Sequence, residues 1–305
     1  APMTGMTRLF HGLCAFPLTP ADAAGQVEAP ELRRLLERLK EARVDSVGLL
    51  GSTGAYVYLE RAQRRRAVEV AVDCLGGAVP LVVGVGALRT DAAEALARDA
   101  AAAGADALLL APVSYTPLTE EEVFQHFRAV AAATELPLCI YNNPATTRFT
   151  FSEALLARLA AIETIRAVKM PLPQERSLPE ELARLRRRLP EGFAIGYSGD
   201  WGCAEALLAG AQAWYSVIGG LLPRPALELT QAAQAGDLAE ARRLDEAFQP
   251  LWRLFREFGS LRVVYAAANL LGLSDAQPPR PLLPLEAQER ARVGAALEAL
   301  GEGTG

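Results

Sequence analysis

Short apolar runs alternate with amphipathic segments along most of the chain. The runs are nearly continuous, as is typical of parallel strands that are covered on both faces. Each run is followed by a loop rich in Gly, Ser or Pro and then by a segment whose apolar residues recur at helical spacing. This pattern predicts eight strands, at residues 10–16, 46–50, 81–83, 107–110, 138–141, 165–169, 193–197 and 213–217.

The length of the repeat distinguishes between fold classes. Strands and helices alternate at about 20 to 30 residues, which is the spacing of βα units. Eight units in succession favour a closed barrel, which occupies about 200–250 residues as one domain. An open doubly wound sheet is the alternative, because periodicity alone does not prove closure. The predicted fold class is therefore α/β, a (β/α)8 TIM barrel.

The pattern changes near residue 238, where strands stop. Helices alone are predicted from there, at residues 238–257, 261–271 and 286–300. A segment without strands cannot extend the barrel, so it is expected to pack on the barrel as an appendage. The sequence is divided accordingly into a barrel over residues 1–236 and a C-terminal helical appendage over residues 237–305.

Three helix starts carry capping signals. Thr119 followed by Glu122 has the spacing of a capping box, and Thr150 followed by Glu153 repeats it. Asp91 is the expected N-cap of a third helix, because its carboxylate can accept backbone N–H groups.

Composition and charge argue against several classes of protein. Of 305 residues 51% are hydrophobic and the net charge is −5, with arginines scattered over helix faces. This argues against binding to nucleic acid, which needs a basic stripe. No apolar run reaches the roughly 18 residues of a membrane span, and no apolar signal core is seen. The four cysteines form no CxxC motif, which favours free buried thiols and a cytoplasmic location; they are Cys14, Cys74, Cys139 and Cys203.

A lysine ends the sixth predicted strand. Of the 31 basic residues only Lys40 and Lys169 are lysine, and the other 29 are arginine. Lys40 belongs to an amphipathic helix, whereas Lys169 lies where a barrel strand opens into the site at the C-terminal ends of the strands. Arginine keeps its proton at neutral pH, but a lysine can be made a neutral amine. Lys169 is therefore a candidate nucleophile, and a snorkelling strand-end lysine is the alternative.

The other strand ends carry hydroxyls, glycines and one tyrosine, and they show no cluster of metal ligands. This set suits a lysine amine that attacks a 2-oxo acid and forms a Schiff base, without a metal or a cofactor. The loop Gly51–Gly54 offers hydroxyls and N–H groups to a carboxylate, and Tyr141 can relay protons. A plain turn and a water-facing tyrosine are the alternatives. The two histidines, His11 and His126, are expected to be structural.

Several motifs in order resemble the dihydrodipicolinate synthase and N-acetylneuraminate lyase superfamily of class I, pyruvate-type aldolases. The resemblance covers nearly the whole chain. It implies that Lys169 forms the Schiff base, that Tyr141 relays protons, and that Ser52 and Thr53 bind the carboxylate, with Gly51 and Gly199 in the motifs beside them. The motifs are Gly12 through Pro20, Gly51-Ser52-Thr53-Gly54 (similar to the family's Gly-Thr-Thr-Gly-Glu), Tyr141-Asn142-Asn143-Pro144, Lys169, and Gly196-Tyr197-Ser198-Gly199-Asp200.

The resemblance also implies partners. The substrates would be a small-molecule 2-oxo acid and an aldehyde, and the chain would form a homo-oligomer, either a dimer or a tetramer built from dimers. Family members often borrow a catalytic tyrosine from a neighbouring subunit, in the loop after the fourth strand. Tyr115 is the nearest candidate for this place, and Ser114 competes with it because the loop is one residue longer here.

The departures from the family concern the second substrate. Ala55 replaces the usual glutamate, and Thr146 lies where synthases carry an arginine, with Arg148 two residues farther on. Met170-Pro171 follows the lysine in place of Glu-Ala, and Tyr215 replaces an aliphatic residue, which would narrow the pocket. The half of the site that binds the 2-oxo acid therefore resembles the family, whereas the half for the second substrate differs.

The expected activity is that of a Schiff-base-forming lyase. The enzyme would condense a 2-oxo acid, with pyruvate as the favoured one, with an aldehyde, or it would catalyse the reverse cleavage. Alternatives are a true 4-hydroxy-tetrahydrodipicolinate synthase with Arg148 reaching in, or a 2-oxo sugar acid dehydratase or hydratase-aldolase. A non-catalytic 2-oxo acid binding barrel and a pyridoxal-phosphate barrel are further alternatives. The presence of both Lys169 and Tyr141 argues against plain binding, and no convincing phosphate cup is seen for the cofactor.

Overall fold

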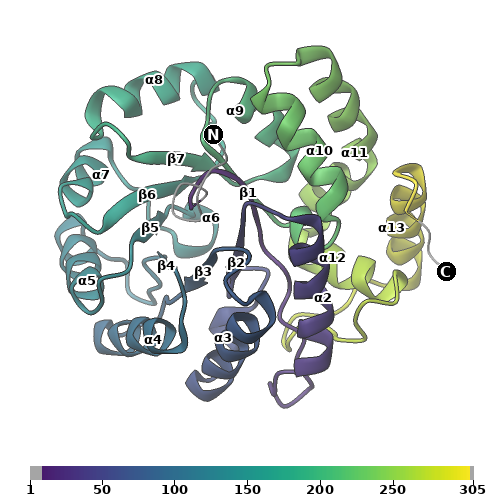
Figure 1. Cartoon of the computed structure of the whole chain (residues 1–305), viewed down its shortest axis with the longest axis horizontal. Helices are drawn as coiled ribbons and strands as arrows, with labels where there is room; N and C mark the ends of the chain where they lie inside the picture. Colours follow the sequence, from purple (N-terminus) through teal and green to yellow (C-terminus); the bar gives the residue numbers. More distant parts are fainter. Residues whose placement is uncertain (1–8, 303–305) are drawn as a thin grey trace.

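The computed structural model describes residues 9–302, and it confirms the predicted barrel. Parallel strands pair in chain order from β1 to β8, and β8 pairs with β1 to close the barrel. Figure 1 shows the strands in the middle of a ring of helices. The strands are β1 (Gly12–Ala15), β2 (Ser46–Leu49), β3 (Leu81–Gly84), β4 (Ala107–Leu110), β5 (Leu138–Tyr141), β6 (Ile165–Met170), β7 (Ala194–Tyr197) and β8 (Ala213–Ser216).

Helices cover the outside of the barrel. Among them α6 is a single turn, which is too short to show helical periodicity in the sequence. The α10 segment does carry an apolar stripe, at Ala226, Leu229 and Ala233, all buried. The helices of the barrel are α2 (Ala29–Ala42), α3 (Arg61–Leu75), α4 (Thr90–Ala103), α5 (Glu120–Ala132), α6 (Pro144–Thr147), α7 (Glu153–Ala160), α8 (Leu178–Arg188), α9 (Cys203–Leu208) and α10 (Pro223–Gln234).

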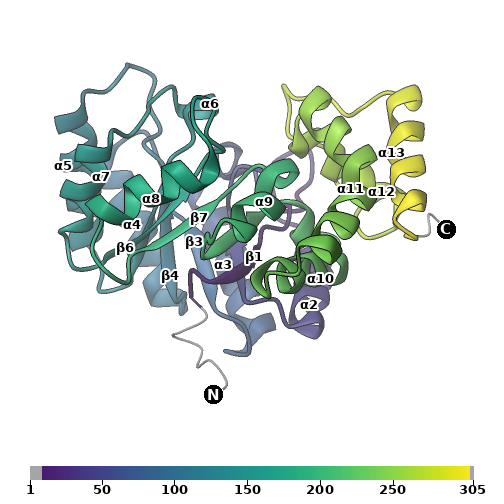
Figure 2. The same cartoon turned by 90° about the horizontal axis from the view of Figure 1, so that it is seen from above.

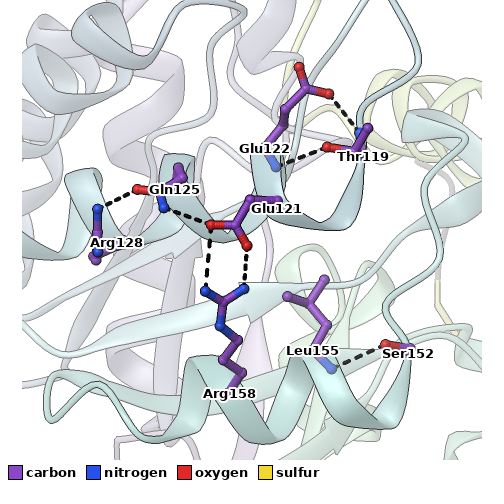
Figure 3. A network of polar contacts seen from close by, with 8 residues as sticks. All are labelled: Thr119, Glu121, Glu122, Gln125, Arg128, Ser152, Leu155 and Arg158. Carbon is purple, nitrogen blue, oxygen red and sulfur yellow. Dashed lines mark hydrogen bonds and ion pairs between the residues drawn. The ribbon is translucent and has the colours of Figure 1, made fainter.

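The start of α5 has the predicted capping box (Figure 3). Thr119 Oγ1 accepts a hydrogen bond from the Glu122 backbone N–H at 3.1 Å, and Glu122 Oε1 accepts one from the Thr119 N–H at 2.8 Å. The first turn of α5 also contacts α7, because Arg158 of α7 donates hydrogen bonds to the carboxylate of Glu121. The box thus sets where α5 begins, and the ion pair joins two neighbouring helices of the ring.

The other two capping predictions were wrong. Asp91 lies inside the first turn of α4, where its carboxylate accepts hydrogen bonds from Arg89, the residue at the N-cap, at 2.9 and 3.0 Å. The N-cap of α7 is Ser152 rather than Thr150, and its Oγ accepts from the Leu155 N–H at 3.1 Å. In both places the helix begins within two residues of the predicted cap, which is the precision that local sequence gives for helix ends.

The inside of the barrel and the layer between strands and helices are separate apolar clusters. Successive strand residues point to opposite faces, so each strand contributes to both clusters. The inner cluster is built mainly from small residues, and these leave room for a few large ones. Its members within the strands or next to them are Cys14, Phe16, Val82, Ala107, Leu109, Ala111, Cys139, Tyr141, Ala167, Ala194, Ala213 and Tyr215.

Tyr215 fits this interior only because residue 196 is glycine. A Cβ at Gly196 would lie 2.5 Å from Tyr215 Cε2 and 2.8 Å from the Ala213 Cβ. We expect Gly196→Ala to lower the free energy of unfolding by about 1–3 kcal/mol, the usual cost of overpacking. Denaturant unfolding measures the change. The double variant Gly196→Ala/Tyr215→Leu should recover part of the loss, and equal stability of Gly196→Ala and the wild type would contradict this account of the packing.

Helices without strands follow the barrel, as predicted. They are α11 (Leu238–Phe258), α12 (Ser260–Leu270) and α13 (Ala287–Ala299). All three pack on one another, and α11 also packs against α9 and α10 of the barrel. Figure 2 shows α11, α12 and α13 together on one side of the barrel. The C-terminal helical extension is confirmed. The division into two parts at residue 236 stays a prediction, and the outer ends of these parts, residues 1–8 and 303–305, lie outside the described residues.

Candidate active site

Lys169 lies inside the barrel near the C-terminal end of β6. The strand runs one residue beyond the predicted end, to Met170, and Lys169 is only 5% exposed. Its Nζ lies 4.1 Å from the centroid of the Phe16 ring and 4.1 Å from that of the Tyr141 ring. Within residues 9–302 it forms no ion pair with a carboxylate. The amine is therefore enclosed by rings and withdrawn from water.

Tyr141 ends β5 directly beside Lys169. The two residues are paired in the register of β5 and β6. The Tyr141 hydroxyl lies 3.0 Å from Ser52 Oγ, and it accepts a hydrogen bond from Asn143 Nδ2 at 3.0 Å. Because Asn143 donates to the phenolic oxygen, the phenolic proton is free to point to Ser52. The structure thus joins Ser52, Tyr141 and Asn143 in a chain of hydrogen-bonding groups next to the amine.

Sequence reasoning missed two residues of this arrangement. Asn143 lies inside the Tyr-Asn-Asn-Pro motif, but no role was predicted for it, although it is two residues from Tyr141 on the same strand end. Phe16 follows β1 directly, and it gave no signal of its own, because an aromatic residue at the end of a buried strand reads as core.

The loop after β2 is a tight turn that leads into the 3-10 helix η1 (Tyr56–Tyr58). Ala55 adopts a left-handed conformation with φ of 56° at the start of η1. Gly51 and Thr53 are buried and Ser52 is half-buried. The structure brings Ser52 to Tyr141, while carboxylate binding by Gly51, Ser52 and Thr53 stays a prediction.

The residues predicted to meet a second substrate lie on α6, which follows β5. Figure 1 places this short helix across the middle of the ring. The Thr146 hydroxyl donates to the Asn143 carbonyl at 3.2 Å, so it is already engaged within the helix. Arg148 caps α6 with its backbone at φ of 60°, and its exposed side chain forms no ion pair within the described part of the chain. The Arg148 guanidinium is therefore a cation without an ion-pair partner in residues 9–302, and it lies beside the open end of the barrel.

Three further residues that were predicted to belong to the site differ in how deeply they lie in the barrel. Tyr215 is 2% exposed, and its hydroxyl lies 3.6 Å from Cys139 Sγ, deep in the barrel. Gly199 follows β7 with φ of 90°, and a Cβ there would lie 2.9 Å from Leu172 Cδ1. Tyr115, in the loop between β4 and α5, is 95% exposed. Substrate contacts of Gly199 and Tyr215 and the relay role of Tyr115 stay predictions.

A buried carboxylate braces the strand ends beside the site. Asp200 Oδ1 accepts a hydrogen bond from Trp214 Nε1 at 2.9 Å, and Oδ2 accepts one from the Ile218 N–H at 2.8 Å. Burial raises the pKa of this carboxyl to about 6, and the two donors work against the rise. Asp200 thus ties the loop after β7 to β8 and to the turn that follows it.

A closed parallel barrel with an enclosed lysine and a tyrosine at adjoining strand ends defines a lyase of the class I aldolase type. The sequence agrees, because the profile of the dihydrodipicolinate synthetase family matches residues 9–300. The chain belongs to the dihydrodipicolinate synthetase family.

Individual relatives match over almost the full length. The 4-hydroxy-tetrahydrodipicolinate synthase of Methylococcus capsulatus is 34% identical over 285 residues, which are 93% of this chain and 96% of the relative. The crystal structure of a dihydrodipicolinate synthase from Agrobacterium tumefaciens is 64% identical with a TM-score of 0.96, covering 97% of this chain and 100% of that one. A chloride-inhibited dihydrodipicolinate synthase from Acinetobacter baumannii, complexed with pyruvate, is 28% identical with a TM-score of 0.88, covering 96% and 99%.

Proposed function

We propose that Lys169 forms a Schiff base with pyruvate and that the resulting enamine adds to an aldehyde. In the reverse direction, the same groups would cleave the carbon–carbon bond of the product and release the aldehyde. The observation that carries the proposal is the enclosed Lys169 amine beside the hydrogen-bonded hydroxyls of Tyr141 and Ser52. The pyruvate complex of the relative from Acinetobacter baumannii supports the choice of 2-oxo acid.

The steps follow from the groups present. The neutral Lys169 amine adds to C2 of pyruvate, and the carbonyl π electrons move to oxygen. Tyr141 passes one proton from nitrogen to that oxygen, which gives the neutral carbinolamine. The carbinolamine hydroxyl then takes a second proton from Tyr141, which solvent replaces, and leaves as water while the nitrogen lone pair forms the C=N bond of a cationic iminium. Tyr141 and Ser52 relay a C3 proton away, which gives the neutral enamine. Its C3 attacks the aldehyde carbon, and the relay returns a proton to the aldehyde oxygen, which becomes a hydroxyl. Water then hydrolyses the new iminium and frees Lys169.

The carboxylate of pyruvate needs donors near the amine. We assign this role to the loop after β2, with the hydroxyls of Ser52 and Thr53 and the backbone at Gly51. Ser52 is already within hydrogen-bond distance of Tyr141, so a carboxylate there would hold C2 close to both the nucleophile and the relay. We also propose that Gly199, in the loop after β7, lies beside the substrate.

Two candidate functions differ in the aldehyde that would serve as the second substrate. We propose an aldehyde less charged than aspartate semialdehyde, because a buried carboxylate needs a cation or several donors. Thr146 has a single hydroxyl, and that hydroxyl donates to Asn143. The names of the relatives favour the synthase instead, and the uncommitted Arg148 is the residue that would grip the second carboxylate in that case.

Two experiments test this function. Pyruvate with borohydride should add one reduced pyruvyl group to Lys169, and peptide mass spectrometry should find none on Lys40. A panel of aldehydes with pyruvate, and cleavage of 2-oxo sugar acids, should then rank aspartate semialdehyde below a neutral aldehyde. A kcat/KM for aspartate semialdehyde above about 10⁴ M⁻¹s⁻¹, as expected of a native substrate, would establish the synthase instead.

We also propose a homo-oligomer, a dimer or a tetramer, in which Tyr115 completes the relay of a second copy. Tyr115 is 95% exposed, and the loops of the same barrel end expose Val57 and Leu88 at 55% and 65%. Exposed apolar side chains on neighbouring loops are typical of a surface that a partner covers.

For the compartment we propose the cytoplasm. Cys14, Cys74, Cys139 and Cys203 are all free and buried, which suits a reducing environment. Nowhere in residues 9–302 is a helix long and apolar enough to cross a membrane.

A further inference from the structure

Three aromatic rings surround the Lys169 amine, and we refer to Phe16, Tyr141 and Tyr215 as the aromatic cage. The Nζ lies 4.1 Å from the ring centroids of Phe16 and Tyr141 and 5.8 Å from that of Tyr215. All three distances are within the roughly 6 Å over which a ring face attracts a cation. The rings come from the ends of β1 and β5 and from β8, so they approach the amine from different sides of the barrel.

The Phe16 ring fills space that is open because two residues beside it, Gly48 and Gly51, have no side chain. A Cβ at Gly48 would lie 2.2 Å from Phe16 Cζ, and one at Gly51 would lie 2.6 Å from Phe16 Cδ1. The edge of the ring also meets Tyr215, at 6.2 Å between centroids and an angle of 64°. Two glycines of the β2 segment therefore make the space for this ring, and its position against the amine is set by packing.

Within residues 9–302, no carboxylate is paired with the Lys169 amine, and the buried Asp200 beside the site is instead engaged by Trp214 and the Ile218 N–H. Burial raises the pKa of the Cys14 thiol and of the Cys139 thiol to about 12, so both are neutral near pH 7. Burial also raises the pKa of Tyr215 well above its ordinary value. Since Lys169 has no carboxylate partner in residues 9–302, the ring faces are the part of the protein that offers a cationic nitrogen negative potential here, in addition to the carboxylate of the substrate.

We propose that the aromatic cage, and Phe16 above all, stabilises the cationic iminium that a 2-oxo acid forms with Lys169. This inference rests on the proposed function, because it requires the adduct. The carbinolamine before the iminium and the enamine after it carry no charge on nitrogen. Ring faces therefore favour the iminium over both neighbours, and the cage increases the fraction of the pyruvate-bound enzyme that is present as iminium.

Fluorination of Phe16 tests the cage without altering its packing. Replacement by phenylalanine carrying one, two and three ring fluorines weakens the negative potential of the face stepwise and changes the shape little. We expect the apparent dissociation constant of pyruvate, measured from the fraction of Lys169 trapped by borohydride, to rise with each fluorine, by about 3- to 30-fold in total. Phe16→Leu, which keeps an apolar side chain but removes the ring, should weaken adduct formation to a similar extent.

Phe193 provides the matched control. It is buried at 7% exposure just before β7, at the other end of the barrel, and the same fluorinated series there should leave pyruvate binding unchanged. Normal adduct formation in the unmodified protein, with a flat series at position 16, would overturn the role of the cage. Failure of the unmodified protein to form any adduct would instead overturn the proposed function, so the two failures are distinguishable.

Discussion

Lys169→Arg should abolish turnover and remove the borohydride-trapped pyruvate adduct. Arginine keeps the positive charge and much of the length of the side chain, but its guanidinium does not lose a proton near neutral pH and cannot attack a carbonyl. Loss of a covalent nucleophile lowers kcat by up to about 10⁶-fold in well-studied enzymes, and we expect a loss of at least about 10³-fold here. Steady-state kinetics and peptide mass spectrometry measure the two effects.

Lys40→Arg is the control for this substitution, because Lys40 is the only other lysine of the chain. Its Nζ donates to the Cys74 carbonyl at 3.2 Å, on the outside of the barrel, and the variant should keep full activity. Circular dichroism should show an intact fold for both variants. Turnover and adduct formation by a folded Lys169→Arg variant would contradict the assignment of the nucleophile.

Tyr141→Phe should lower kcat by roughly 10²–10⁴-fold, the range for a positioned acid–base group. The phenyl ring remains beside Lys169, so the aromatic cage keeps its three faces while the hydroxyl is lost. Proton transfers to and from the carbinolamine then lack the group that lies 3.0 Å from Ser52 Oγ. The dissociation constant of pyruvate should change much less than kcat, because trapping reports an equilibrium rather than the rate of proton transfer.

Tyr265→Phe is the matched control for this prediction. Tyr265 is equally enclosed, at 3% exposure, but it belongs to α12 outside the barrel. Its variant should retain normal kinetics. Nearly normal turnover of Tyr141→Phe would show that Tyr141 is structural and that another group carries the proton.

The sequence by itself determined the order of the strands and the place of the lysine. A strand that is buried on both faces must be apolar almost throughout, so its position is visible in a short window of sequence. Ala107–Leu110 and Leu138–Tyr141 were predicted with the same bounds as in the structure. Lys169 stood out for a similar reason, since a lysine among 29 arginines at a strand end is a local feature.

Only the tertiary structure decided what surrounds the amine. Phe16, Tyr141 and Tyr215 are far apart in sequence, and they meet around Lys169 because β8 pairs with β1 and closes the barrel. The donation from Asn143 to the Tyr141 hydroxyl depends on how the chain turns after β5. Distances of this kind follow from closure and side-chain packing, which involve all eight strands at once, so no single window of sequence contains them.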